Sequence, residues 1–570
     1  MRLVIREYLS MLKETGELDS LLSDLVLAMG LNPLTRPKTG PRQYGVDLPA
    51  VGIDEDKSRK LFLITIKRGD ITRNDWDTGK QAVRPSLNEI LDSYLRTRVR
   101  PEHEKLTKKI ILATGGELKQ DVEPDWVNYI NTNGGTHPKH GNIEFDFWGA
   151  DKLALLIERY FLDEYLFPES AQKRVRKTIA LADQNEYEPR YFYDLIEEIL
   201  FDKKIPIGKS ASSRRKRQKA FRLLNLSLNI VFYWCKEAEN LKPSLLCAER
   251  TVLRSWDWMR QKKLFDCPIT NKEYVHLFAT YIKINRAYVI KLQPHCMIRD
   301  GLFGYGADEL EYPLRSFELI GFMGVFGMAH CFLANASLEV EAQNNFSKEA
   351  QTIAMTLASL IKNNPATWTP RYDGHAIDIA LGLLTLANTG YSTQAIEWLE
   401  KLSGRIIFAY QLGRHFPVSS DSYDELVAME VGLAPPKEKL MDLSTILPML
   451  ADWYAYFDLV DSYESFQKAV TATFSKTDLQ TWYPEDKTDE YLYRTNAGFQ
   501  SGVTLTSIKL PETLSCLKER IVRIRKEREE FMKLSCFAQG WPILGLIASR
   551  HFRTPISPLY WQSDIAEAND

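Results

Sequence analysis

The chain has 570 residues, of which 44% are hydrophobic and 26% are charged, and its formal net charge is −2. A single hydrophobic core does not grow to this length, so two to four domains are expected. The composition is that of an ordinary soluble globular protein. The near-zero net charge excludes a global basic field, so any contact with nucleic acid must come from local basic patches.

The cysteines and histidines argue against disulfide and zinc chemistry. There are seven cysteines, an odd number, and no two form a C-x-x-C pair. The opening residues "MRLVIREYLS" lack the apolar run of a signal peptide. This pattern predicts a reducing, cytoplasmic location with no disulfide framework and no zinc knuckle. No H-x-x-x-H spacing occurs, which disfavours a zinc-protease site.

The segment 319–336, "LIGFMGVFGMAHCFLANA", is the most apolar in the chain's second half. It is short for a membrane span, contains His330, and has no flanking basic cluster. Gly321, Gly324 and Gly327 recur every three residues, which allows close helix packing. We therefore predict a buried core helix and no membrane partner.

The first 165 residues alternate between helical and strand patterns. Apolar spacing predicts, in chain order, helices at 3–13 and 17–29, an edge strand and turn within 31–43, strands at 44–53 and 60–68, a helix at 78–98, a strand at 108–116, a short helix at 121–131, a strand at 142–149 and a closing helix at 150–161. This order is typical of an α/β domain with a mixed sheet flanked by helices.

After about residue 170 the strand signals fade and long amphipathic stretches dominate. We predict a helical linker with a basic run at 166–220 and a large all-α domain at 221–570, built as one or two subdomains. Residues 375–406 read as two antiparallel helices with a glycine-containing turn, as in helical-repeat proteins. No second copy follows at a fixed period, which favours an irregular helical domain over a solenoid.

Polar residues at one strand end suggest catalysis. In "KLFLITIK" (60–67) the two-residue period puts Thr65 and Lys67 on one face. Antiparallel pairing through the turn "DEDKSR" would bring Asp47 near that end. A carboxylate that holds Mg²⁺ and a lysine that orients water or neutralises charge suit metal-assisted phosphodiester hydrolysis. A third acid could come from the preceding helix, which offers Glu17, Asp19 and Asp24.

These segments together resemble the PD-(D/E)xK nuclease superfamily, which has the restriction-endonuclease-like fold. The resemblance is strongest to modification-dependent restriction enzymes and archaeal Holliday-junction resolvases. It rests on "ELDSLLSDLVLAMG", "YGVD" and "ITIK" in that order, followed by "KKIILAT" and "IEFDFWGADKLALLI". It covers about residues 1–165 and none of the rest.

The resemblance implies roles for particular residues. Asp47 would bind the metal, Lys67 would be the catalytic lysine, and Asp19 would be the helix acid. Thr65 departs from the family, which usually has Glu, Asp or Gln there, so Mg²⁺ or Mn²⁺ would be held by Asp47, the Ile66 carbonyl and Asp19. The alternative reading of Asp47 and Lys67 is a simple cross-strand ion pair.

Basic residues near the strand end could contact phosphates. Those that follow Lys67 are Arg68, Arg73, Lys80 and Arg84, interleaved with aspartates. Trp76 either anchors this loop, which we favour, or stacks on a base. Gln81 either orients the metal-bound water or is an exposed helix residue. The one dense basic run, "SRRKRQK", contains Arg214, Arg215, Lys216 and Arg217, and predicts either a DNA-tracking helix start or a solvated hinge.

The sequence therefore favours a metal-dependent DNA endonuclease whose helical part senses or regulates. Such an enzyme would be an effector of bacterial anti-phage defence or restriction, acting on double-stranded DNA, as a homo-oligomer or with a partner defence protein. The first alternative is a catalytically inactive DNA-binding or assembly scaffold, as Thr65 would allow. The second is an RNA nuclease, although no RNP-type aromatic pair is present.

Overall fold

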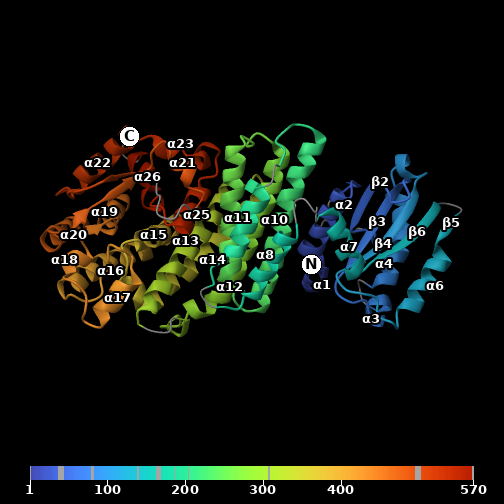
Figure 1. Ribbon diagram of the computed structural model, residues 1–570, viewed down its shortest axis with the longest axis horizontal. Coiled ribbons are helices and arrows are strands. Elements are labelled where there is room, and N and C mark those ends of the chain that lie inside the picture. The colour runs from blue at the N-terminus through green and yellow to red at the C-terminus, as the bar shows by residue number, and fades with distance from the viewer. Residues whose placement is uncertain are drawn as a thin grey trace. The chain divides into compact units, whose positions relative to one another are not determined.

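The computed structural model describes residues 2–35, 44–78, 82–137, 140–161, 168–184, 187–202, 205–305, 309–494 and 502–567. The chain forms two compact units, Met1–Pro243 and Ser244–Asp570. Both are visible in Figure 1, the first built around a sheet and the second largely helical. The sequence placed boundaries at 165 and 220, whereas the first unit continues to Pro243.

The first unit contains the predicted mixed sheet. Within the described ranges it has six strands in the order β1-β2-β3-β4-β6-β5. Strands β3, β4 and β6 run parallel, and the pairs β1/β2, β2/β3 and β5/β6 are antiparallel. Their bounds are Asn32–Pro33, Leu48–Ile53, Arg59–Lys67, Thr107–Thr114, Gly135–His137 and Gly141–Trp148 for β1 to β6. The central strands β3 and β4 are apolar over most of their length because parallel strands are covered on both faces.

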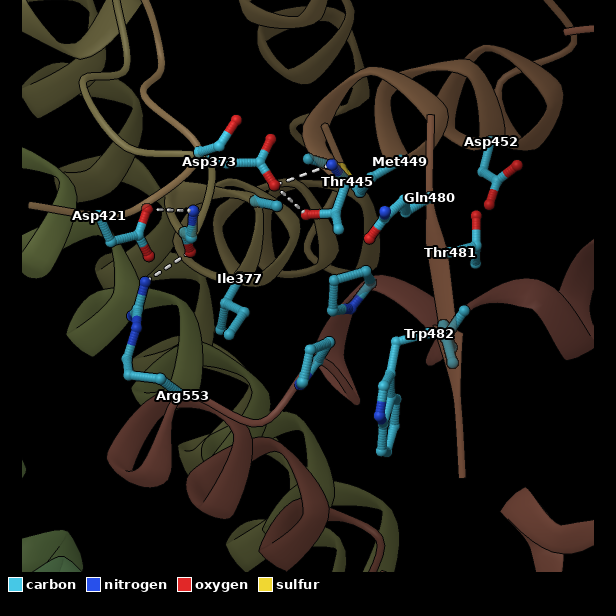
Figure 2. A pocket seen from close by; sticks show the side chains of 16 residues that line it. Asp373, Ile377, Asp421, Thr445, Met449, Asp452, Gln480, Thr481, Trp482 and Arg553 are labelled. Carbon is cyan, nitrogen blue, oxygen red and sulfur yellow. Dashed lines mark hydrogen bonds between the residues drawn. The ribbon is translucent and has the colours of Figure 1, made fainter. Parts of the chain in front are cut away.

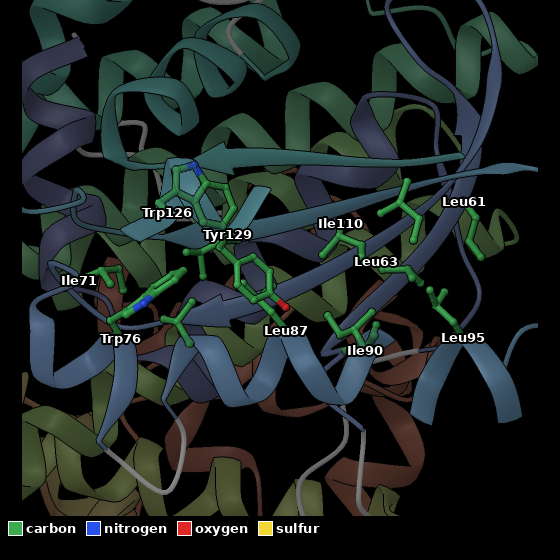
Figure 3. Packing of buried hydrophobic residues seen from close by; sticks show 14 of the residues in the cluster. Leu61, Leu63, Ile71, Trp76, Leu87, Ile90, Leu95, Ile110, Trp126 and Tyr129 are labelled. Atoms are coloured by element: carbon green, nitrogen blue, oxygen red, sulfur yellow. The ribbon is translucent and has the colours of Figure 1, made fainter. Parts of the chain in front are cut away.

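One face of the sheet packs against α3 (Arg73–Asp77), α4 (Val83–Glu89), α5 (Leu95–Thr97) and α6 (Glu123–Asn133). Figure 3 shows Leu61 and Leu63 of β3 facing Leu87 of α4 and Leu95 of α5 across this core. The opposite face is covered by α1 (Arg2–Met11), α2 (Asp19–Ala28) and α7 (Ala150–Tyr160), which contact one another and strands β2 and β6. The sheet is therefore buried on both sides.

Trp76 belongs to this core. It is 1% exposed and meets Trp126 and Tyr129 edge to face, with ring centroids 6.2 and 5.9 Å apart. Such pairs are stabilised by the electrostatics of the rings in addition to burial. The prediction that Trp76 anchors the loop is confirmed.

Three further helices complete the first unit: α8 (Glu169–Ala180), α9 (Arg190–Glu197) and α10 (Ala211–Glu237). Helix α10 packs against the N-terminal helices, where Tyr233 and Tyr8 have ring centroids 5.4 Å apart. Arg222 of α10 also lies 3.8 Å from the Asp24 carboxylate. The region expected to be a linker is thus packed into the folded unit.

The second unit is largely helical but not all-α. Short strands β7 (Leu443–Ser444) and β8 (Asp478–Leu479) pair in parallel, and β9 (Thr481–Tyr483) pairs antiparallel with β10 (Val503–Leu505). The all-α expectation is corrected here, because strands of two or three residues carry no local periodicity. Its long helices are α11 (Lys242–Gln261), α12 (Pro268–Cys296), α13 (Glu311–Ala336), α14 (Val340–Asn363), α15 (His375–Asn388), α16 (Ser392–Gln411), α19 (Ile446–Tyr456), α20 (Val460–Thr473), α22 (Leu514–Glu527) and α25 (Ile543–Phe552).

The glycines of α13 allow α15 to approach closely, as the sequence predicted. A Cβ atom on Gly324 would lie 2.6 Å from the backbone of Leu381, and one on Gly327 would lie 2.3 Å from the Thr385 side chain. Among the described residues, α13 alone has the length and apolar composition of a membrane-spanning helix, and 78% of its most apolar window is buried inside the protein.

Candidate functional site

The end of strand β3 holds Asp47 and Lys67 as the pairing argument required. In the register of the β2/β3 hairpin Leu48 is opposite Ile64, so Asp47 lies beside the C-terminal end of β3. The Asp47 N–H donates to the Ile64 carbonyl at 2.9 Å, and its Oδ2 accepts the Ile66 N–H at 2.7 Å. The carboxylate therefore extends the hydrogen-bond ladder past the end of β2 and is fixed in place.

Thr65 and Lys67 share one face, because β3 pairs with β4 continuously from Lys60 to Lys67 with no bulge. Lys67 is partly exposed, whereas Thr65 is fully buried. The Thr65 hydroxyl lies near enough to Asp47 to lower the pKa of that carboxyl, yet it has no partner at hydrogen-bond geometry. A buried polar atom without a partner needs a physical explanation, and a bound water or ion is one of those that occur.

The loop after Lys67 is pinned to the loop after β4. Ile71 forms a β-bridge with Leu118. The Asp70 carboxylate accepts the Glu117 N–H at 2.9 Å and pairs with Lys119 at 2.7 Å. These contacts hold the end of β3 rigid, which a catalytic constellation requires.

Two more acids approach from the connection between α1 and α2. Glu14 opens a π-helical turn (Glu14–Leu18) in which Thr15 and Gly16 are not helical, and Gly16 has a φ of +83°. Asp19 is the first residue of α2, and its Oδ1 accepts the Ser20 N–H at 2.6 Å. Because the chain bends at Gly16, the Glu14 carboxyl lies within electrostatic range of Asp47, Lys67 and Asp19.

We call Glu14, Asp19, Asp47 and Lys67 the β3-end cluster. Burial raises the pKa of Asp47 most strongly, the Ile66 N–H and Lys67 lower it, and the charge of Asp19 raises it further. Burial also raises the pKa of Glu14, with Lys67 opposing and Asp47 and Asp19 adding to the shift. With all four groups ionised the cluster carries a net charge of −2, which a divalent cation would balance.

The fit of a metal ion to this cluster depends on how many ligands the ion needs. Among the residues that the structure describes, no group of three or more His, Cys, Asp or Glu side chains could hold a metal ion. Mg²⁺ does not require such a cage, because it keeps several water molecules and binds through one or two carboxylates. Asp47, with one oxygen fixed by Ile66 and acids nearby, suits an ion held in that way.

Glu14 was missed from the sequence, and two of the three acids offered there lie elsewhere. Glu17 accepts the Lys13 N–H at 2.8 Å and interacts with Tyr233 of α10. Asp24 faces Arg222. Asp19 alone of the three is coupled to Asp47. Gly16 is the residue that could have pointed to Glu14. A glycine between two helical stretches allows the chain to bend, so residues before it need not follow the helix face that the period of α2 implies.

The basic residues after Lys67 differ in availability. Arg68 and Arg73 are exposed. Arg84 is partly exposed but already engaged, because it pairs with Asp77 and lies 5.9 Å over the Trp76 ring. Lys80 and Gln81, which the sequence proposed for phosphate and water contacts, lie outside the described residues.

The basic run forms the first turns of α10. Arg214, Arg215 and Lys216 are exposed, but Arg217 is only 2% exposed. Its Nη1 donates to the carbonyls of Pro206 at 2.8 Å and Gly208 at 3.0 Å. Arg217 is therefore a structural residue, and we correct its assignment as a phosphate contact.

Comparisons of this chain with protein-family models, with curated proteins and with solved structures find no match.

Proposed function

We propose that the first unit is a metal-dependent DNA endonuclease of the PD-(D/E)xK type and that the second unit regulates it. One observation carries the proposal: the carboxyls of Glu14, Asp19 and Asp47 lie within electrostatic range of one another or of Lys67 at the end of β3. Like charges that lie close together and are partly buried cost stability, so their presence favours a functional role over a structural one. In the cell, this would be a cytoplasmic effector of bacterial anti-phage defence or restriction.

The chemistry follows from the positions of the side chains. A bound Mg²⁺ or Mn²⁺ would polarise the phosphate and lower the pKa of the attacking water. Asp47 and the Ile66 carbonyl would hold the ion, with Asp19 acting through water. Lys67 is on the same face as Thr65, where its ammonium can stabilise charge developing on the phosphate. Glu14, whose pKa is raised, is suited to accept the proton of the water.

Duplex DNA is the proposed substrate because the available cations are spread along the surface of the first unit. Arg68 and Arg73 are exposed just after the end of β3, and Arg214, Arg215 and Lys216 are exposed on α10. Exposed arginines and lysines bind phosphates without reading sequence.

The direct test incubates the full chain with supercoiled plasmid and with structured RNA, under Mg²⁺, Mn²⁺ or EDTA. We expect plasmid cleavage with either metal, none with EDTA, and faster cleavage with Mn²⁺, because Mn²⁺ binds nitrogen and oxygen ligands more tightly than harder ions do. Cleavage of RNA alone would instead support the RNA nuclease, and cleavage that EDTA leaves unchanged would contradict the proposal.

An inactive scaffold is the second candidate, and Thr65 favours it because a hydroxyl replaces the usual acid. Thr65→Glu would add a carboxylate on the face of Lys67, and we expect it to tighten Mn²⁺ binding roughly tenfold, the scale on which one group near a metal changes affinity. Calorimetric titration of metal into the folded protein measures this without relying on activity.

Thr65→Gln is the matched control, because it has the size of Glu without the charge. We expect its Mn²⁺ affinity to stay near that of the unmodified chain. If neither the unmodified chain nor Thr65→Glu binds metal while both melt cooperatively, the scaffold replaces the nuclease as the better account.

A further inference from the structure

The second unit contains a pocket of about 200 Å³ that the nuclease chemistry does not use. Its walls come from the start of α15, the segment with Ser419 and Asp421 before α17 (Tyr423–Glu430), helix α19, strand β9 and the segment that follows α25. Figure 2 shows Asp421 and Arg553 on one side and Asp452, Thr481 and Trp482 on the other. All of these residues belong to Ser244–Asp570.

Asp373 lines the acidic side of the pocket and is fixed by hydrogen bonds within the protein. Asp373 accepts four hydrogen bonds, from the backbone and hydroxyl of Thr445, from the Ile446 N–H and from the Ser444 hydroxyl. Its acceptor capacity is filled, so it shapes the pocket and is not available to a ligand. These hydrogen bonds are all within the protein, so this wall of the pocket forms without a ligand.

The one arginine of the lining is already neutralised. Both Nη atoms of Arg553 donate to the Asp378 carboxylate at 2.9 Å, and Nη2 also donates to the Gly374 carbonyl. A bidentate pair of this kind leaves little positive charge for an anionic ligand. The pocket therefore does not suit a phosphate or a carboxylate.

Two aspartates keep acceptor capacity that faces the pocket. Asp421 uses Oδ1 to accept the Gly374 N–H at 3.0 Å, and it holds a left-handed backbone conformation with a φ of +51°. Asp452 is 5% exposed, and the Gln562 amide at 2.9 Å is the single hydrogen-bond donor to it among the described residues. Loss of solvent around the carboxyls raises the pKa of each to about 6. At neutral pH Asp452 is thus a buried carboxylate with no cation in hydrogen-bond contact among the described residues, whereas Asp421 lies at the exposed edge of the pocket near Arg553.

The remaining lining is apolar or neutral. Ile377, Met449, Trp482, Pro555 and Pro558 offer hydrocarbon and ring surface, and Gln480 and Thr481 add neutral polar groups. A pocket with apolar walls and a few converging polar groups is the usual form of a small-molecule site.

We propose that this pocket binds a small organic cation, with its ammonium or guanidinium at the buried carboxylate of Asp452 and its apolar or planar body against Trp482 and the prolines. A cation supplies the countercharge that the Asp452 carboxylate lacks, and the flat walls exclude water from that contact. Such a ligand would give the second unit a signal to sense.

The first experiment titrates tyramine and agmatine into the full chain by calorimetry at about pH 7.5, with 4-ethylphenol as the probe that keeps the tyramine ring and lacks the ammonium. We expect at least one of the two amines to bind with one site per chain and 4-ethylphenol to bind at least tenfold more weakly. Binding of 4-ethylphenol as tight as that of tyramine, or no binding of either amine, would overturn the proposal.

The second experiment changes the carboxylates. Asp452→Asn keeps an acceptor for the Gln562 amide but removes the charge, and it is expected to weaken amine binding about tenfold or more. Asp421→Asn keeps an acceptor for the Gly374 N–H at the exposed edge of the pocket and should weaken binding less. Asp442→Asn is the matched control, because Asp442 is exposed and does not line the pocket. Equal affinity in the control and in both pocket variants would place the amine elsewhere.

A pH series on the unmodified chain gives a readout that does not depend on variant folding. Asp421 interacts with Asp373, Asp378 and Arg553, and Asp452 interacts with Arg520, Tyr463 and Tyr483. Both pocket carboxyls take up a proton as the pH falls through about 6, so amine affinity should drop between pH 7.5 and 5. Affinity that stays constant over this range would also overturn the proposal.

Discussion

Replacing Lys67 by methionine is expected to slow metal-dependent plasmid cleavage by roughly 10³-fold, because the transition state loses its nearest fixed positive charge. Methionine keeps the unbranched stem at a partly exposed strand end, so no cavity opens and the fold should persist. Cleavage rates measured at saturating Mn²⁺, with melting curves of both proteins, give the comparison.

Lys105→Met is the control for this change. Lys105 is exposed and precedes β4, whose parallel pairing with β3 puts it at the opposite end of the sheet from Lys67. It makes the same change in charge and length and should leave the rate unaltered. A Lys67→Met protein that cuts plasmid as fast as Lys105→Met would remove Lys67 from the chemistry.

Asp47→Asn tests the proposed metal-holding residue and should slow plasmid cleavage roughly 10³-fold, as expected for Lys67→Met. The amide oxygen can still accept the Ile66 N–H, so the local ladder survives. Burial raises the pKa of Asp47, which means that its ionised form costs stability at pH values above that pKa. The neutral variant should therefore melt no lower than the unmodified protein at pH 7, and lost activity with a lowered melting temperature would point to misfolding instead.

The strands of the first unit were predictable because their signals are local. The apolar runs at 60–68 and 108–116 correspond to β3 (Arg59–Lys67) and β4 (Thr107–Thr114) within two residues. Strand β5 was not predicted, because its three exposed residues have no apolar pattern and pair only through β6. Local periodicity thus identifies covered strands and misses short edge strands.

The sequence predicted one continuous helix at 78–98, but the structure has several shorter elements there. The structure has α3 ending at Asp77, α4 starting at Val83, and a π-helical turn at Ile90–Tyr94 before α5. The start of α3 had a readable signal, since Thr72 and Asp75 form a capping box of the T-x-x-D kind. The π turn has no comparable sequence mark.

The site was predictable in so far as it depends on one hairpin. Asp47 and Lys67 follow from strand alternation and antiparallel pairing, both of which are local rules. Glu14 depends on a bend at Gly16, and the burial of Arg217 depends on carbonyls nine and eleven residues earlier in the chain. Such contacts depend on the path of the backbone, which residue pattern alone does not specify.

The exposed residues of the basic run are available to DNA phosphates, whereas the buried Arg217 is not. Changing Arg214, Arg215 and Lys216 to glutamine should weaken binding of the full chain to duplex DNA equally for unrelated sequences. Each phosphate contact releases counterions, so losing three should reduce the slope of log affinity against log salt by up to about 2.7. Fluorescence anisotropy over a salt series, with metal omitted to prevent cleavage, measures both quantities.

Two control proteins make this result specific. Lys57, Arg96 and Lys105 are exposed, and Lys57 in the β2/β3 turn lies at the end of the sheet away from Lys67, so their triple change to glutamine alters charge equally and should leave the salt slope unaltered. Arg217→Gln should instead lower the melting temperature, because the Pro206 and Gly208 carbonyls lose a buried charged donor. Equal slopes for both triple variants would show that the run serves the fold of α10 and does not contact DNA.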